Sequence, residues 1–150
     1  MKRKIDLAEK QTPESLVYEF FNRVWCPPHE LEAIDELMTE DYCITTAGVV
    51  IKGRTKFKNW VEAFQRLLLE AENEIVDIFY NEAQNKVVAR WICRGKNNGL
   101  FGLPANDEPI SFSGIAIWMV RNGRLSECWV ERSAYELYQS LKSEDEKKFV

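Results

Sequence analysis

This 150-residue sequence has a single histidine, no cysteine motif and no long apolar run. Its single histidine is His29, and its four cysteines, Cys26, Cys43, Cys93 and Cys128, are scattered without a C-x-x-C pair. This excludes the zinc patterns in which closely spaced cysteines and histidines share one metal, so no metal site is expected. Two of the cysteines lie within apolar strand patterns, which indicates buried, reduced thiols. The histidine, in "CPPHE", is expected in a solvated turn or at a helix start.

No stretch approaches the ~20 apolar residues that a membrane-spanning helix needs. The first ten residues are basic, but no apolar run follows them, so a secretory signal is not expected. With a net charge of −4 and no basic stripe, a nucleic-acid partner is not expected either. The sequence therefore predicts a cytoplasmic protein without membrane or nucleic-acid partners.

What is present is the composition of a globular domain, with 45% hydrophobic and 29% charged residues. Neither repeats nor a linker divide the chain, so we expect a single domain over residues 1–150. Its folded core is predicted for about residues 12–140. A short helix and a polar tail are expected after the last strand.

Three segments with helical spacing come first. Residues 11–25 begin with Thr12 as the N-cap and Pro13 at the first helical position, and apolar residues then recur at helical spacing. A shorter helix is predicted for residues 29–38, and a third for residues 54–72, after a small strand insertion.

Strand patterns follow these helices. Residues 41–53, the small insertion, are rich in β-branched side chains, and residues 73–132 alternate with a period of two. The latter region predicts two strands within residues 73–95 and two within residues 110–132, the second pair joined at the turn Asn122-Gly123. Helices followed by strands predict an α+β fold, with the helices on one face of an antiparallel sheet.

The strand that begins at residue 110 is apolar on both of its faces. A sheet with one solvated face would alternate apolar and polar residues. Here two interleaved apolar sets are present instead: Phe112, Ala116 and Trp118 on one face, and Ile115, Ile117 and Met119 on the other. We therefore expect the chain's own helices on one face and a second copy of the chain, in a homodimer, on the other.

Six stretches resemble the SnoaL-like branch of the nuclear transport factor 2-like superfamily, which includes polyketide cyclases. They run in the family's order and cover residues ~15 to ~130, nearly all of an ordinary domain. The six stretches are "YEFFNRVW", "LEAIDELMTEDY", "GRTKFKNWVEAF", "VVARWICRG", "GLFGLPANDEPISFSGIAI" and "NGRLSECWV". The most specific of them is the stretch that begins with "GLFGLPANDEP". The resemblance implies a cone-shaped α+β barrel, in which a curved antiparallel sheet wraps around the N-terminal helices and encloses a deep apolar cavity. It also implies a dimer packed through the sheets.

The resemblance further implies chemistry without a metal or organic cofactor. Family cyclases close a ring by an intramolecular aldol condensation, in which an aspartate or histidine in the cavity removes a proton next to a carbonyl. At the positions that correspond, this sequence has Cys128 and Val130 beside the tryptophan of the last strand, Ala116 in the preceding strand, and Thr45 shortly after "DY". The usual catalytic pattern is therefore missing.

Other polar residues are candidates to replace that pattern. We predict that Tyr18, Thr45 and Arg90 polarise a carbonyl group while a water molecule or a substrate group carries the proton. Glu127 and Glu131 are predicted outside the cavity, because they alternate with the residues that face it. Residues predicted to line the cavity and contact a small hydrophobic ligand are Phe21, Tyr42, Trp60, Ala116, Cys128 and Val130.

Each catalytic candidate has a structural alternative. Tyr18 and Tyr42 could be buried tyrosines whose hydroxyl groups are satisfied within the protein. Arg90 and Arg94 share one strand face; an inward arginine would demand an anionic ligand, whereas outward arginines paired across strands are the favoured interpretation.

Three functions therefore compete. The first is a cofactor-free cyclase, isomerase or hydratase that acts on a hydrophobic polyketide- or terpenoid-like metabolite. The second is a small-molecule-binding dimer that has lost the family's acid–base residues. The third is a mainly structural dimer that supports a partner, because one fold hosts many functions.

Overall fold

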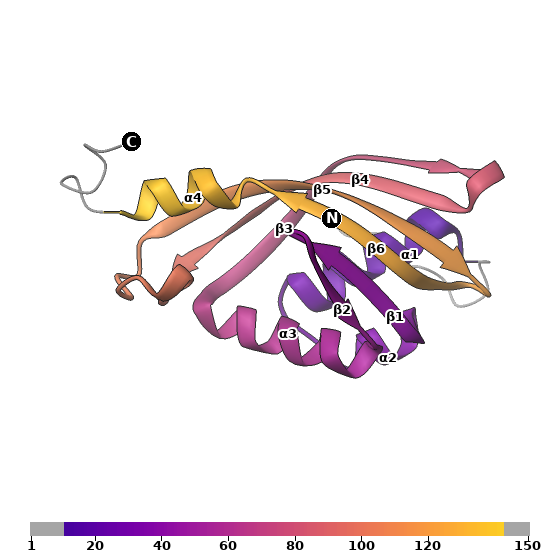
Figure 1. Cartoon of the computed structure of the whole chain (residues 1–150), viewed down its shortest axis with the longest axis horizontal. Helices are drawn as coiled ribbons and strands as arrows, with labels where there is room; N and C mark the ends of the chain where they lie inside the picture. The colour runs from indigo at the N-terminus through magenta and orange to yellow at the C-terminus, as the bar shows by residue number, and fades with distance from the viewer. Residues whose placement is uncertain (1–10, 143–150) are drawn as a thin grey trace.

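The structure, a computed structural model, describes residues 11–142 and has the predicted α+β fold (Figure 1). The basic N-terminal segment and the C-terminal polar tail expected from the sequence fall largely outside this range. In chain order the elements are α1 (Pro13–Phe20), η1 (Phe21–Trp25), α2 (Ala33–Leu37), β1 (Met38–Thr46), β2 (Val49–Lys52), α3 (Arg54–Leu67), β3 (Leu68–Asn81), η2 (Glu82–Gln84), β4 (Lys86–Asn97), η3 (Leu100–Gly102), β5 (Pro109–Arg121), β6 (Arg124–Arg132) and α4 (Ala134–Leu141).

The strands form one six-stranded sheet in the order β2-β1-β6-β5-β4-β3. All neighbours are antiparallel except β1 and β6, which run parallel, so the sheet is mixed rather than wholly antiparallel. The edge strands β2 and β3 do not pair with each other among the described residues, so the curved sheet stays open and does not close into the expected barrel.

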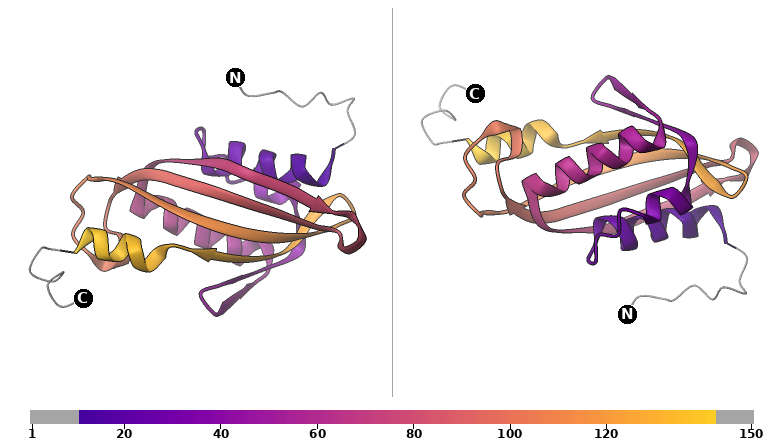
Figure 2. Two further views of the ribbon diagram at one scale, coloured as in Figure 1. Left: turned by 90° about the horizontal axis from the view of Figure 1, so that it is seen from above. Right: turned by 90° about the horizontal axis from the view of Figure 1, so that it is seen from below.

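The sheet arches over the helices α1, α2 and α3, which lie on its concave side (Figure 1). In the left view of Figure 2, seen from above, the strands lie in front of these helices, and α4 lies at one end of the sheet. The core fills the space between the concave face and the helices, since the buried side chains of both meet there. Any cavity of this fold must lie in that layer.

The first helix begins as its sequence predicts but ends in an unexpected geometry. Ser15 N donates a hydrogen bond to Thr12 Oγ1 (3.1 Å) and Thr12 N donates to Ser15 Oγ (2.9 Å), a reciprocal cap. From Phe21 to Trp25 the backbone forms a π-helical turn, a geometry that is frequent at functional sites. Both of these aromatic side chains are buried under the sheet.

The third helix is shorter than predicted. Its buried residues Phe57 and Val61 follow helical spacing, but the helix ends at Leu67 instead of continuing to residue 72. From Leu68 onwards the chain pairs with β4, and Leu68 itself is buried. Backbone pairing with a neighbouring strand thus overrides the helical propensity of the sequence "LLLEAE".

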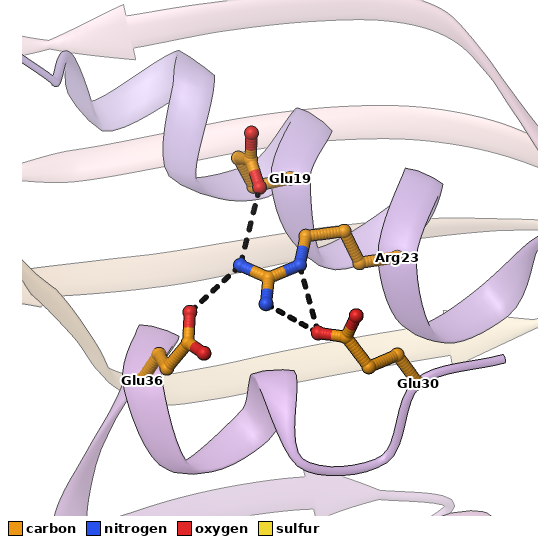
Figure 3. Close-up of polar contacts among 4 residues, drawn as sticks. All are labelled: Glu19, Arg23, Glu30 and Glu36. Carbon is orange, nitrogen blue, oxygen red and sulfur yellow. Dashed lines mark hydrogen bonds and ion pairs between the residues drawn. The ribbon is translucent and has the colours of Figure 1, made fainter. Parts of the chain in front are cut away.

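An ion cluster joins the two N-terminal helices (Figure 3). The guanidinium of Arg23, in η1, contacts Glu19 at 3.4 Å, Glu36 of α2 at 2.8 Å, and Glu30 in the connection between them. Arg23 lowers the pKa of the Glu36 carboxyl through this hydrogen bond, and its own pKa is raised. The cluster holds α2 against the turn that carries Phe21 and Trp25.

The convex face of the sheet carries an apolar row across four strands. Phe79, Val88, Ile117 and Trp129 are successive neighbours in the register. Phe79 is 60% and Ile117 is 37% exposed. The described chain therefore leaves this row to solvent, as the two-sided apolar pattern of β5 predicts. None of the described helices is long and apolar enough to cross a membrane.

Candidate functional site

A narrow cavity of about 30 Å³ lies between the concave face of the sheet and the helices. This volume holds about one water molecule, far less than the deep cavity expected from the sequence, because aromatic rings fill the interior. The residues that line it are Phe20, Phe21, Trp25, Tyr42, Ile44, Phe57, Trp60, Phe64, Asn73, Trp91, Cys93, Phe112, Ala116, Trp118, Cys128, Val130 and Arg132.

Strand alternation places the sheet residues of this lining. On β6, Cys128, Val130 and Arg132 face the cavity, whereas Glu127 and Glu131 belong to the opposite face, as predicted. The same alternation applies to β1, β4 and β5. The strands β1, β4 and β5 contribute aromatic side chains, and α1, η1 and α3 contribute the remaining ones.

The aromatic rings of the lining contact one another edge to face. The ring of Phe21 lies 6.1 Å from Trp91 and 5.8 Å from Trp118, at interplanar angles of 85° and 73°. Trp60 and Phe64 of α3 are stacked at 5.5 Å. Edge-to-face and stacked pairs stabilise this arrangement of rings, so the walls of the cavity are aromatic as well as apolar.

Gly114 makes room for the indole of Trp91. A Cβ atom at position 114 would lie 2.2 Å from Trp91 Cζ2, a distance that real carbon atoms do not adopt. Gly114 pairs with Trp91 across β4 and β5 and is itself buried. A glycine is therefore required for this ring to lie flat against the sheet.

Arg132, at the end of β6, is the one arginine in the cavity lining. Its guanidinium carbon lies 5.2 Å from the ring centre of Trp60 and 5.9 Å from that of Trp91, and Nη1 donates a hydrogen bond to Thr46 Oγ1 (2.6 Å). No carboxylate of residues 11–142 lies within 4.0 Å of it, and burial lowers the pKa of its side chain. Two indole faces and one hydroxyl group thus surround a partly buried cation.

Four other polar atoms of the lining have no hydrogen-bond partner within the described chain. They are the Tyr42 hydroxyl, the indole nitrogens of Trp91 and Trp118, and Oδ1 of Asn73. Burial raises the pKa of Tyr42 well above its usual value, so the hydroxyl keeps its proton. Three of the four groups, the Tyr42 hydroxyl and the two indole nitrogens, can donate a hydrogen bond, and an indole N–H is a donor only. The cavity therefore offers donors to a ligand that carries acceptor oxygens.

The lining contains no carboxylate and no imidazole. Its ionisable groups besides Arg132 are Tyr42, Cys93 and Cys128. Burial raises the pKa of each thiol to about 12. All three groups are protonated at neutral pH, so none of them can act as a general base there.

The residues predicted as lining do come together. Phe21, Tyr42, Trp60, Ala116, Cys128 and Val130 all line the cavity.

The three residues predicted as catalytic lie outside this cavity. Tyr18 is 41% exposed and lines a separate groove of about 330 Å³ that shares Phe21 and Asn73 with the cavity. Thr45 pairs with Trp129 on the convex face. Arg90, also on that face, lies 4.0 Å from Asp77, the cross-strand pairing named above as the alternative.

The inward position of Arg132 and the unpartnered indole nitrogens of Trp91 and Trp118 were not predicted from the sequence. The period of two that orients Cys128 and Val130 inward also orients Arg132 inward, two residues further along β6. Its signal was therefore present in the sequence. No comparable signal existed for the unpartnered indole nitrogens, because hydrogen-bond partners depend on the packed structure.

No group of three or more potential metal ligands occurs among residues 11–142. His29 is partly buried, and its Nε2 lies 2.8 Å from the carbonyl oxygen of Ala71, between the connection after η1 and strand β3.

Comparison with family models gives a match to the SnoaL-like polyketide cyclase family over residues 15–141. A protein of Jannaschia sp. CCS1, assigned as a SnoaL-like polyketide cyclase, has a TM-score of 0.78 at 11% identity, over 89% of this chain and 97% of that chain. One of Acidithiobacillus ferrooxidans, assigned as a polyketide cyclase, has a TM-score of 0.78 at 19% identity, over 91% and 97% of the two chains.

IdmH of Streptomyces antibioticus, also assigned as a polyketide cyclase, has a TM-score of 0.76 at 18% identity, over 87% of this chain and 99% of that chain. Comparison with curated proteins gave no match. At these identities the likeness to solved structures establishes the fold, while chemistry must be argued from the cavity.

Proposed function

The chain belongs to the SnoaL-like polyketide cyclase family, and from that premise we propose that it is a cyclase or isomerase that polarises a carbonyl group of a flat, hydrophobic metabolite. The observation that carries this proposal is the set of unpartnered donors inside an aromatic cavity. Such donors stabilise the negative charge that develops on a carbonyl oxygen when a neighbouring C–H proton leaves.

The proposed chemistry assigns the principal role to Tyr42. Its protonated hydroxyl, which lies beside the Trp118 N–H and the Cys128 thiol, donates to the carbonyl oxygen of the ligand, and the Trp118 N–H supports that hydroxyl. A water molecule accepts the proton from the neighbouring carbon, because the lining offers no side chain that could. Ring closure or isomerisation of a carbonyl compound conserves its oxidation state, so the reaction needs no redox cofactor.

The walls favour a flat, unsaturated ligand of the polyketide or terpenoid kind. Aromatic rings surround the cavity and offer faces and edges to such a molecule. A ligand larger than water requires side chains at the rim to move. Trp60 and Phe64 are suited to this, because both are only partly buried and both lie on one helix, α3.

The proposal is tested with acetophenone as the probe, in D₂O. We expect the protein to accelerate deuterium exchange at the methyl carbon next to the carbonyl, followed by proton NMR. Unfolded protein at equal concentration is the control for unspecific catalysis. An exchange rate equal to that in buffer alone would contradict the proposed carbonyl polarisation.

A second candidate function is binding without turnover. The absence of a general base from the lining favours it, since three of the four ionisable lining residues are neutral at physiological pH. The lining includes four tryptophans, Trp25, Trp60, Trp91 and Trp118, so ligand binding should change the intrinsic fluorescence. Acetophenone that binds by this criterion but does not exchange would select the second candidate.

We propose also that the protein is a homodimer through the convex face. The row Phe79, Val88, Ile117 and Trp129 is the apolar surface that a second copy would cover. Light scattering coupled to gel filtration should give twice the mass of one chain. Ile117→Asp should halve that mass, because it places a charge in the centre of the row, whereas Ser111→Asp on the same face of β5 should not.

A further inference from the structure

The arginines of the described chain differ sharply in their surroundings. Six of them contact a carboxylate within 4.0 Å: Arg23, Arg54, Arg66, Arg90, Arg94 and Arg121. Within residues 11–142, Arg124 and Arg132 do not. Arg124 is exposed, so water solvates it, but Arg132 is partly buried and lines the cavity. A cation removed from water normally requires an anion.

Residues 11–142 supply no anion on the cavity side of Arg132. The neighbouring thiols of Cys93 and Cys128 and the hydroxyl of Tyr42 keep their protons at neutral pH. Glu131 precedes Arg132 directly, but strand alternation places it on the opposite face, where it is exposed. The attraction of two indole rings offsets part of the desolvation cost but leaves the charge uncompensated.

The geometry around Arg132 also fits one class of anion better than others. A guanidinium offers donors in a planar fork, and only Nη1 has a described partner, Thr46. A carboxylate matches that fork with two parallel hydrogen bonds in one plane. A phosphate carries more negative charge than Arg132, the one arginine of the described lining, can compensate.

We propose that Arg132 binds the carboxylate of an aromatic or conjugated acid whose hydrocarbon part lies among the rings of the cavity. This rests on the proposed function only in that the cavity accepts a ligand, and not on turnover of that ligand. Arg132 then acts as the group that selects and orients the ligand, while the Tyr42 hydroxyl remains available to its second polar group.

The test compares two probes of equal size, benzoate and benzamide, by tryptophan fluorescence and by isothermal titration. Benzoate is expected to bind about 10- to 100-fold more tightly, since hydrogen bonds to a charged group exceed neutral ones by such a factor. Arg132→Gln should remove this preference. The matched control is Arg90→Gln, which removes the same charge from the convex face and should leave the preference intact.

Equal affinities of the native protein for the two probes would overturn the proposal while leaving a cavity that binds neutral ligands. A preference for benzoate that survives in Arg132→Gln would overturn it as well, because another cation would then be responsible. Binding of neither probe would contradict both this proposal and the proposed function. Arg132→Lys adds a variant that keeps the charge: it should retain part of the preference and also show that the position tolerates substitution, as judged by circular dichroism.

Discussion

Tyr42→Phe is expected to slow the deuterium exchange of acetophenone by about 100-fold, the usual effect of removing one donor that stabilises a developing oxyanion. The hydroxyl is buried and protonated, and its polar neighbours are the Trp118 N–H, which cannot accept, and the Cys128 thiol, a weak acceptor, so it loses little when it donates to a ligand. The phenyl ring of the variant keeps the packing of Tyr42 against Phe57, whose ring centre lies 4.9 Å away. The variant therefore isolates the hydroxyl group.

The thermal stability of the variant shows whether a slower exchange comes from the lost hydroxyl group or from a disturbed fold. Tyr42→Phe removes a buried polar group that has no partner, so its midpoint of thermal unfolding should equal or exceed that of the native protein. Tyr18→Phe is the matched control, because Tyr18 lies outside the cavity and its variant should exchange acetophenone at the native rate. Native exchange by Tyr42→Phe would show that the hydroxyl takes no part in the reaction.

Asn97→Ala is expected to lower the free energy of unfolding by about 3 kcal/mol, since it leaves several buried polar groups without partners. Asn97 is only 1% exposed. Its Oδ1 accepts hydrogen bonds from the backbone N–H groups of Gly99 (3.0 Å) and Leu100 (2.9 Å), and its Nδ2 donates to Pro104 O (3.0 Å) and Asn106 Oδ1 (2.9 Å). One side chain thus organises the whole connection between β4 and β5.

Urea unfolding followed by circular dichroism measures this loss. Asn98→Ala is the control, because the neighbouring Asn98 is exposed and its side chain donates a single hydrogen bond, to Arg66 O at 2.8 Å. The control should lose no more than about 1 kcal/mol, the net contribution of one such bond. Equal losses for the two variants would contradict the role assigned to the Asn97 amide.

The fold could be predicted from the sequence because its periodicity is strong. The alternation of β5 and β6 and the Thr12 cap each specify local structure that the molecule adopts. The end of α3 at Leu67 and the parallel pairing of β1 with β6 could not be predicted this way, because both depend on strand partners distant in sequence.

The candidate site was predictable only in part, and for a similar reason. Alternation identifies which strand residues face inward, so the strand residues of the lining could be inferred from the sequence. The same rule also predicts that Arg132 faces inward. Helix residues are harder to place, because no period of two orients them: Tyr18 of α1 lies outside the cavity, whereas Phe21 and Trp25 of the π-helical turn line it. Whether a buried donor has a partner depends on packing that periodicity does not encode.

The open edge at β3 bears on how the protein avoids fibrous self-association. Within the described chain, β3 pairs with β4 on one side only, and the outer edge of such a strand of 14 residues can template pairing with another chain. Here Glu70, Glu72, Glu74 and Asp77 are all exposed, and the register shifts twice along the strand. Charged side chains at a strand edge disfavour pairing with an approaching copy, and the bulges deny that copy a straight template. The charges and bulges of β3 therefore disfavour the addition of another strand to this edge of the open sheet.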